Sequence, residues 1–440
     1  MMTSSIEQLA GKKVLFATIS TDAHIDPLTG LAKYLQDCGC DVRWYASEYY
    51  TTKFHRLYIY HYTPRKHRQV NEENADEPPP GGTRVRDRVA KLNHHLTHTF
   101  ARPAARHFEN IRSIFEVFPF DIVIVDNMFT AAPIIRKILG IPVIAIGVVP
   151  LAEASRDLPP YGLGITPSHH LLGRLKQAAL RFLTDKILFK ESYKVYEQVF
   201  KTYGIRNKGA NMLDSIIKNA DLVLQIGTPG LEYQRRDMGN NIRYIGALQP
   251  YSADEKKLPW FDDRLHQYRK IALVTQGRTG KDVNNIIIPT LEAFRNTNVL
   301  TIVATGGSGT EALRAKYPYS NVIIEDYIPF ADVMPYADVF ITDGGYDGVL
   351  LSLQHRLPII AAGTDECKNE TCARIGYMKY GINLHTENPG ADQISKAFDT
   401  ILATPLYKTN ISRLKEELSQ YDPVPLSAGY VADLLTKRPA

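Results

Sequence analysis

A histidine and an aspartate occupy positions in this sequence where they could form an acid–base pair. His24 follows the apolar run 13–20 (KVLFATIS), and histidine is suited to take a proton from a hydroxyl near neutral pH. Asp126 follows the run 121–125 (DIVIV), and a carboxylate bonded to the far ring nitrogen would fix the tautomer and stabilise the protonated ring. Two plainer interpretations stay open: a freely titrating surface histidine, and Asp126 as the N-cap of a helix over 128–139.

Glycine-rich turns in the second half are the other candidates for chemistry. TGGSGT, residues 305–310, follows the apolar run 299–304, and Gly344, Gly345 and Gly348 follow the run 338–342. Glycines at the start of a helix let backbone amides approach a phosphate, and the helix dipole favours an anion there. A glycine pair also occurs in ordinary tight turns, so this pattern alone is a weak signal.

Short strands alternating with helices must position these residues. In the first half we predict a helix over 26–38, with His24 in the loop before it, and strands over 13–20, 41–45, 121–125 and 142–146. In the second half we predict a helix over 282–295 and strands over 270–275, 299–304, 321–325, 338–342 and 358–362. Continuous β-branched runs separated by helices indicate parallel sheets covered on both faces. The fold class is therefore α/β, with two doubly wound domains whose ligands bind at the carboxyl ends of the strands.

The composition is that of a globular protein of two or three domains. The chain has 440 residues, 44% of them hydrophobic and 22% charged, and a formal net charge of +5. This mild charge lacks the clustered Lys and Arg of a nucleic-acid-binding protein. Four cysteines are too few for a disulfide framework and lack zinc-ligand spacing, so we expect reduced thiols and no metal. No run reaches the roughly 18 apolar residues that cross a bilayer, and no signal peptide is apparent, so we expect a cytoplasmic protein.

Two basic segments allow alternatives. Residues 171–203 are helical in pattern and rich in Lys and Tyr. We interpret them as a solvated helix pair rather than a membrane-surface helix, because no apolar face of the required strength is evident. Residues 53–69 mix basic and aromatic side chains, and we favour a surface loop over a nucleic-acid patch.

Residues 325–374 resemble the donor-binding signature of the glycosyltransferase family that includes plant and bacterial natural-product glycosyltransferases. The shared arrangement is an aromatic residue, Ile-Pro, a strand, Gly-Gly, a Pro-bearing strand and an acidic-polar loop. Residues 23–27 (AHIDP) resemble that family's loop with its catalytic base, and the similarity runs in order along nearly the whole chain. It implies the GT-B fold of two Rossmann-like domains. Several stretches are more narrowly similar to bacterial flavonoid rhamnosyltransferases, which implies dTDP-rhamnose as donor: DCGCDVRWYASEYY, DLPPYGLGITPS, IGTPGLEY, TGGSGT and IEDYIPFADVMPYADV.

The resemblance also implies roles for individual residues. His24 would deprotonate the acceptor hydroxyl, with Asp126 as its orienting partner. Tyr327 would stack on the nucleotide base and Ile328 would touch it through its backbone. The remaining donor-binding candidates are Gln276 and Arg278 in the loop TQGRTG, Gly306, Gly307, Asp343, Gly344, Gly345, Asp347, Gly348, Lys368 and Asn369.

Some positions depart from the family pattern. Asp343 replaces the usual diphosphate-binding histidine and Asp347 the usual polar residue, and two carboxylates would repel a diphosphate unless protonated, turned away or countered by a cation. Arg278 is a candidate for that cation. The Asp-Gln pair that holds glucose hydroxyls is absent, and our alignment places Lys368 and Asn369 there. The ribose-binding glutamate falls on Leu351, which suits a 2′-deoxyribose.

The expected enzyme is an inverting, metal-independent glycosyltransferase that uses no cofactor beyond its nucleotide-sugar co-substrate, dTDP-rhamnose or a UDP-sugar. The acceptor would be a small phenol such as a flavonoid, in a pocket with Met128, Phe129 and Tyr161; nucleic acid and stable membrane insertion are not expected. A non-catalytic sugar-nucleotide-binding protein and a sugar-nucleotide epimerase of the same fold stay open. The expected division is an acceptor-binding domain over 1–247, a linker over 248–262, a donor-binding domain over 263–415 and, over 416–440, a C-terminal helix packing back on the first domain.

Overall fold

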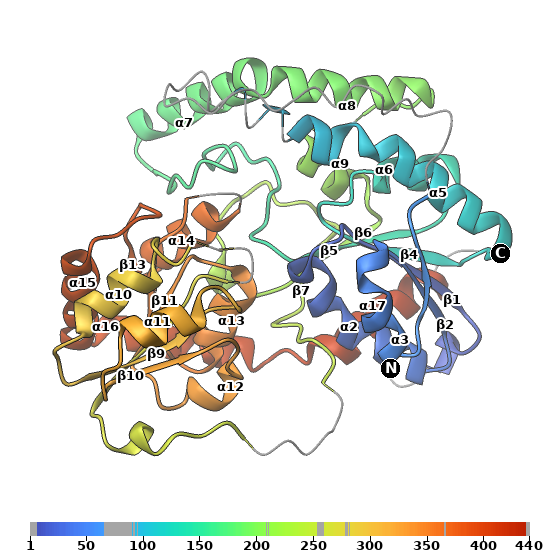
Figure 1. Cartoon of the computed structure of the whole chain (residues 1–440). Coiled ribbons are helices and arrows are strands. Elements are labelled where there is room, and N and C mark those ends of the chain that lie inside the picture. Colours follow the sequence, from blue (N-terminus) through green and yellow to red (C-terminus); the bar gives the residue numbers. More distant parts are fainter. Residues whose placement is uncertain are drawn as a thin grey trace.

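Two parallel sheets, one from each half of the chain, form the framework of the protein (Figure 1). The computed structural model describes residues 7–65, 90, 93–94, 96–207, 209, 211–252, 259–277, 280, 282–364 and 367–436.

The first sheet has the strand order β3-β2-β1-β4-β5-β6-β7, and all its pairings are parallel. The chain winds outward from β1 to β3 and then returns to place β4 on the other side of β1. The loops after β1 and β4 therefore diverge, which opens a crevice at the carboxyl edge between these strands. The strands are β1 (Lys13–Ala17), β2 (Asp41–Tyr45), β3 (Tyr60–Tyr62), β4 (Ile122–Asp126), β5 (Val143–Gly147), β6 (Leu222–Gln225) and β7 (Ile242–Tyr244).

The second sheet repeats this topology with the order β10-β9-β8-β11-β12-β13, again with parallel pairings. Its reversal of winding lies between β8 and β11. The strands are β8 (Lys270–Thr275), β9 (Val299–Ala304), β10 (Val322–Glu325), β11 (Val339–Thr342), β12 (Ile359–Ala361) and β13 (Gly381–Asn383). The prediction of an α/β fold with two doubly wound domains is confirmed.

Helices cover both faces of each sheet. In the first half they are η1 (Glu7–Leu9), α2 (Asp22–Asp37), η2 (Glu48–Tyr50), α3 (Thr51–Arg56), η3 (Leu96–Ala101), α5 (Pro103–Val117), α6 (Ala132–Ile138), α7 (Leu171–Leu183), η4 (Thr184–Leu188), α8 (Lys190–Thr202), α9 (Met212–Asn219) and η5 (Pro229–Leu231). In the second half they are η6 (Asp263–His266), α10 (Ile287–Phe294), α11 (Thr310–Lys316), α12 (Phe330–Val333), α13 (Tyr346–Gln354), α14 (Lys368–Tyr377), α15 (Ala391–Ala403), α16 (Leu406–Leu418) and α17 (Pro423–Thr436).

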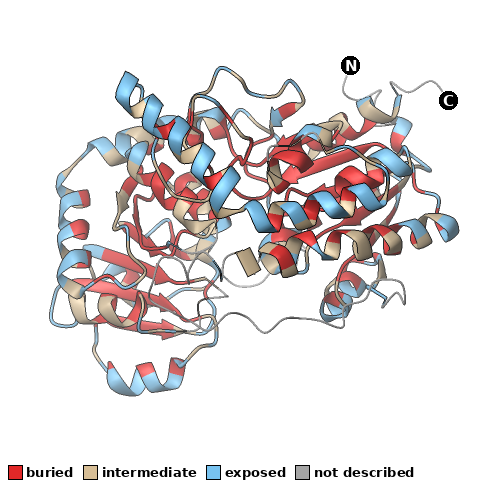
Figure 2. Cartoon of the chain, turned by 90° about the horizontal axis from the view of Figure 1, so that it is seen from above, coloured by how far each residue is buried: buried red, intermediate tan, exposed pale blue. Residues whose placement is uncertain are grey.

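The strands are buried on both faces because alternate side chains enter different cores. In β1, Val14 and Phe16 join the cluster that includes α2, whereas Leu15 and Ala17 join the cluster that includes α5 and α6. Figure 2 shows the resulting red interior beneath a pale-blue helical surface. The α2-side cluster also contains residues of the second sheet, so one hydrophobic core is continuous between the two halves.

The start of α2 differs from the prediction. The helix begins at Asp22 rather than at residue 26, so His24 lies in its first turn and not in a preceding loop. Pro27 therefore lies inside the helix. Proline lacks a backbone N–H, so its presence favours a helix start at its own position, and here that local preference is overridden.

The last helix returns to the first domain. After α16, which packs on α13 and η5, α17 packs against α2 and η1. No helix in the described part of the chain is both long and apolar enough to cross a membrane.

Candidate active site

His24 and Asp126 meet at the point where the first sheet reverses its winding. His24 Nδ1 lies 2.9 Å from Asp126 Oδ1, and the two side chains belong to α2, directly after β1, and to the end of β4. Asp126 is fully buried, whereas His24 is 6% exposed. An ionised carboxylate can only accept, so Nδ1 carries the proton and Nε2 is left with a free lone pair.

The Asp126 carboxylate is held by further bonds. Its Oδ2 accepts the Ile19 amide at 2.7 Å, and its Oδ1 accepts the Met128 amide at 2.8 Å. The N-cap of α6 is Ala131, so the alternative of Asp126 as a helix N-cap is wrong: it bonds a turn that precedes the helix. Hydrogen bonds from backbone amides stabilise the charged carboxylate and fix its orientation toward the imidazole.

A second ionic contact holds the first turn of α2. Lys53 Nζ lies 2.9 Å from Asp22 Oδ1 and also bonds Asp26. The two aspartates flank His24 in sequence, so this lysine of α3 fixes the turn that carries the imidazole.

The carboxyl edges of the two sheets face one another. Tyr346, the first residue of α13, donates its hydroxyl proton to Ile226 O at 2.8 Å, directly after β6. Its phenol is buried, and burial raises the Tyr346 pKa well above its usual value. Gly227 has φ of +106°, and a side chain there would approach this hydroxyl to 2.8 Å. Since β6 lies two strands from β4, Ile226 is about 10 Å along the edge from Asp126.

The glycine turn of the second domain lies at its own reversal point, between β11 and α13. Gly344 has φ of +90°, and a β-carbon there would lie 2.4 Å from Cys372 Sγ, so only glycine fits. Gly345 is the N-cap of α13, which leaves the first amides of that helix without intrahelical partners. Gly348 lies in the first turn of the helix.

The two carboxylates beside this turn are in different environments. Asp343 Oδ2 lies 2.9 Å from Lys368 Nζ at the start of α14, so its charge is compensated. Asp347 is exposed to solvent. The sequence suggested Arg278 as the compensating cation; Arg278 lies outside the described residues. The cation that the structure places on Asp343 is Lys368, which sequence reasoning had aligned to a sugar-contacting position.

Lys368 and Asn369, which the alignment predicts to contact the sugar, have different partners in the structure. Asn369 Nδ2 donates to Gly162 O at 2.6 Å in the first domain, and Lys368 faces Asp343. These consecutive residues at the start of α14 point in different directions, one toward the glycine turn and one across the domain boundary, and their contact with the sugar stays a prediction.

The remaining donor candidates are divided between surface and core. Tyr327 is 70% exposed, and its hydroxyl lies 3.3 Å from Gly306 O, which brings the aromatic ring to the glycine turn after β9. Ile328 is buried against the core. Gln276 is buried as well. Its amide nitrogen donates to Gly280 O and Asp282 O within its own loop. Gly306 and Gly307 both have positive φ, of +65° and +86°.

The three acceptor candidates do not share one open surface. Phe129 is fully buried, with its ring against Tyr45 and His107. This corrects its assignment to a pocket wall. Tyr161 packs against the same core cluster. Met128 is half-buried. Its backbone amide donates a hydrogen bond to Asp126 Oδ1, the oxygen that also contacts His24.

A buried ionic network that sequence reasoning missed joins the domains. Arg374 of α14 bonds Glu232 Oε2 through Nε at 2.9 Å, and Glu370 Oε2 through Nη1 at 2.9 Å. Glu370 Oε1 in turn accepts the amides of Gly162 and Gly164 at 2.8 and 2.9 Å. Every charged group in the network is 4% exposed or less at its side chain. The i,i+4 spacing of Glu370 and Arg374 was the available signal, but Glu232 is too distant in sequence to have been paired with it.

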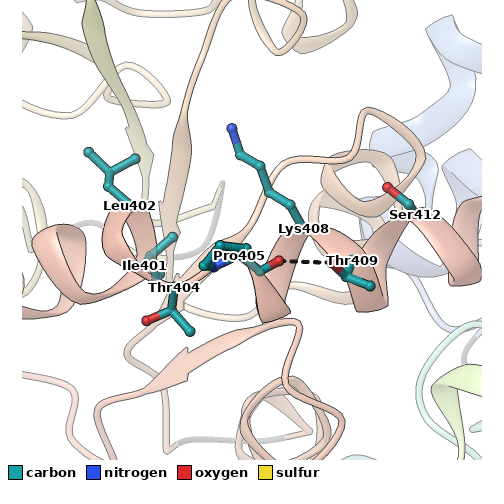
Figure 3. Close-up of a pocket in the computed structure, with 7 residues that line it drawn as sticks. All are labelled: Ile401, Leu402, Thr404, Pro405, Lys408, Thr409 and Ser412. Carbon is teal, nitrogen blue, oxygen red and sulfur yellow. Dashed lines mark hydrogen bonds between the residues drawn. The ribbon is translucent and has the colours of Figure 1, made fainter.

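Other features of the molecule do not contribute to this site. A hollow at the junction of α15 and α16, lined by residues between Ile401 and Ser412, contains none of the candidate residues (Figure 3). Burial raises the pKa of the Cys372 thiol to about 12, so it stays neutral beside Gly344. Among the described residues, no three His, Cys, Asp or Glu side chains are grouped to hold a metal ion.

Comparison with known proteins finds similarity to glycosyltransferases. Residues 311–426 match the model of UDP-glucoronosyl and UDP-glucosyl transferases. The 4'-demethylrebeccamycin synthase of Lentzea aerocolonigenes is 28% identical over 94% of this chain and 97% of its own length. UDP-glycosyltransferase 2 of Phaeomoniella chlamydospora is 30% identical over 66% of this chain and 65% of its own. The chain is thus similar, over most of its length, to glycosyltransferases of the UDP-glycosyltransferase type.

Solved structures show which fold the chain has. The glycosyltransferase of kitacinnamycin has a TM-score of 0.74 at 16% identity, covering 97% of this chain and 99% of its own. The calicheamicin glycosyltransferase CalG4 has a TM-score of 0.71 at 15% identity, covering 98% and 99%. The predicted GT-B fold is confirmed by these neighbours.

Proposed function

We propose that this glycosyltransferase transfers a sugar, with inversion, from a nucleoside diphosphate to a hydroxyl of a small aromatic acceptor, with His24 as the base. The observation that carries the proposal is the 2.9 Å contact between His24 Nδ1 and a fully buried Asp126, on a sheet edge that faces the glycine turn of the other domain. Intact base and partner also favour an enzyme over a sugar-nucleotide-binding accessory protein.

On the acceptor side, His24 Nε2 takes the proton of the acceptor hydroxyl as its oxygen attacks the anomeric carbon. The bond from that carbon to the diphosphate oxygen breaks, and the diphosphate leaves with the electron pair. Asp126 stabilises the imidazolium that forms, and its two amide bonds keep the carboxylate from turning away. Inversion at a β-L-rhamnosyl donor would give an α-rhamnoside.

On the donor side, the free amides at the start of α13 suit the diphosphate, whose charge grows as the bond breaks. Lys368 supports this role because it neutralises Asp343, the carboxylate nearest the turn in sequence. The exposed ring of Tyr327 suits stacking on a nucleotide base.

We propose dTDP-rhamnose as the donor and a flavonoid as the acceptor. Leu351, a half-buried apolar side chain of α13, would leave no polar group unsatisfied beside a 2′-deoxyribose. Two structural neighbours are described with thymidine diphosphate bound, the spinosyn rhamnosyltransferase SpnG and the glycosyltransferase VinC. Named relatives include UDP-glucosyltransferases, so UDP-sugars are the main competing donors.

A donor screen tests this proposal. We expect dTDP-rhamnose with quercetin to give a mass increase of one deoxyhexose by mass spectrometry, with much weaker product from UDP-rhamnose and UDP-glucose. The control is the same incubation without quercetin, because an epimerase would convert the donor alone. Preference for UDP-sugars would reject the donor assignment, and the absence of any quercetin glycoside would reject the acceptor assignment.

Loss of the Lys368 cation should weaken donor binding. In Lys368→Met, Asp343 would present an uncompensated carboxylate to the diphosphate, and we expect dTDP affinity to fall about tenfold by calorimetry. Lys396→Met on α15 is a matched exposed control that should bind like wild type. Lys368→Met/Asp343→Asn should recover most of the affinity, and unchanged binding in the single variant would contradict the role of Lys368.

A further inference from the structure

The helix α7 and the following segment η4 direct a polar face at the protein, whereas an amphipathic helix usually directs its apolar face there. The side chains directed at the body are Gln177 and Thr184, both 3% exposed, and Arg181. Gln177 Nε2 donates to Ser168 O at 2.8 Å, and Arg181 donates to Leu158 O. Spacings of four, seven and three residues put these polar side chains on one face, so α7 is anchored by polar contacts.

The opposite face is apolar and points away from the protein. Leu171, Leu175 and Phe182 follow one another at intervals of four and seven residues, which places them on one face of the helix. In Figure 1, α7 and α8 lie across the top of the molecule, and in Figure 2, seen from above, α7 is mostly pale blue. The exposed members are Leu171 (75%), Leu172 (80%), Leu175 (60%), Phe182 (63%), Leu183 (43%) and Ile187 (59%). We call these six side chains the α7 stripe.

The charged side chains around the α7 stripe are mostly basic, and the exposed acid Glu191 directly follows Lys190. Residues 171–190 all fall within the described part of the chain, and their exposed charged side chains are Arg174, Lys176, Lys186 and Lys190. Asp185, the acidic residue of this stretch, is half-buried. An apolar stripe bordered by cations is the pattern of helices that lie in the interface of an anionic bilayer.

We propose that the α7 stripe docks this glycosyltransferase reversibly on an anionic lipid surface. The apolar side chains would enter the region between headgroups and acyl chains, while Arg174, Lys176, Lys186 and Lys190 contact lipid phosphates. The polar contacts of Gln177 and Arg181 hold the helix on the protein in this orientation. The sequence interpretation of a solvated helix pair missed this surface, because it found no apolar face of the required strength over residues 171–203.

A second copy of the chain is a poorer partner for this surface. Pairing two α7 stripes would bring eight cations together, against one exposed Glu191 from each copy, and like charges at close range repel. An anionic bilayer complements both the apolar and the charged side chains.

Vesicle co-sedimentation tests the proposal on the full-length protein. With vesicles of phosphatidylcholine and phosphatidylglycerol at low salt, we expect wild type to sediment, and with phosphatidylcholine alone to sediment much less. Leu175→Gln/Phe182→Gln should lower the partition coefficient about tenfold or more. Lys176→Gln/Lys186→Gln should lower it about fivefold per cation removed and reduce the salt dependence.

Matched controls keep the outcome interpretable. Val117→Gln/Ile138→Gln replaces exposed apolar side chains on α5 and at the end of α6, and Lys396→Gln/Lys408→Gln replaces exposed lysines on α15 and α16; both should sediment like wild type. Wild type that stays in the supernatant, or stripe variants that sediment equally well, would overturn the proposal. A wild-type dimer by light scattering that Leu175→Gln/Phe182→Gln makes monomeric would also overturn it, in favour of self-association.

Discussion

Replacing His24 with alanine should lower kcat on the order of 10³-fold while leaving dTDP affinity unchanged. General-base catalysis contributes about 10² to 10⁴-fold, and in the proposed mechanism the imidazole acts on the acceptor hydroxyl, whereas the nucleotide lies on the other domain. Initial rates with saturating donor and acceptor, together with calorimetric dTDP binding, separate these two effects.

Two further variants sharpen this test. Asp126→Asn should also lower kcat strongly, because an amide can present its NH₂ group to His24 Nδ1 and so favour the unproductive tautomer. His55→Ala, an exposed histidine on α3, should keep wild-type rates. A His24→Ala enzyme with near wild-type kcat would eliminate His24 as the base.

Replacing Arg374 with methionine should destabilise the folded protein by about 3–5 kcal/mol, the usual effect of removing one partner from a buried ion pair. The change would leave the carboxylates of Glu232 and Glu370, both buried at the domain boundary, without their shared cation. Urea unfolding followed by circular dichroism measures the loss as a lower midpoint.

Controls distinguish a buried-charge effect from general loss of an arginine. Arg156→Met removes an arginine that is 92% exposed and should change stability by about 0.5 kcal/mol or less. Arg374→Met/Glu370→Gln should unfold at a higher midpoint than Arg374→Met, since it removes the buried carboxylate that loses its cation, whereas Glu232 keeps Arg235 at 3.9 Å. If Arg374→Met unfolds at the wild-type midpoint, the network does not stabilise the domain boundary.

The fold was predictable because its strands are buried on both faces. β2, β8 and β9 have the bounds expected from their apolar runs, since a continuous β-branched segment fits few other environments. β3 (Tyr60–Tyr62) lacks such a run and was missed. The start of α2 was misplaced because Pro27 favours a helix start locally, whereas the packed helix extends a turn further back.

The candidate site was only partly predictable for a different reason. His24 and Asp126 each follow an apolar strand, so topology alone places them at one edge. Contacts between side chains distant in sequence, such as Lys368 with Asp343 and Arg374 with Glu232, leave no periodic signal. Phe129 shows the opposite error: an aromatic residue near a catalytic candidate was assigned to a pocket, although it is core.

The return of α17 to the first domain affects how the chain matures during synthesis. Ala428, Val431 and Ala432 of this last helix belong to the same core as Leu28 and Leu31 of α2, which leave the ribosome about 400 residues earlier. The side of α2 that α17 covers thus stays exposed until α17 has been synthesised. A nascent chain stalled before α17 would carry the residues of both domains and yet expose the apolar surface of the first.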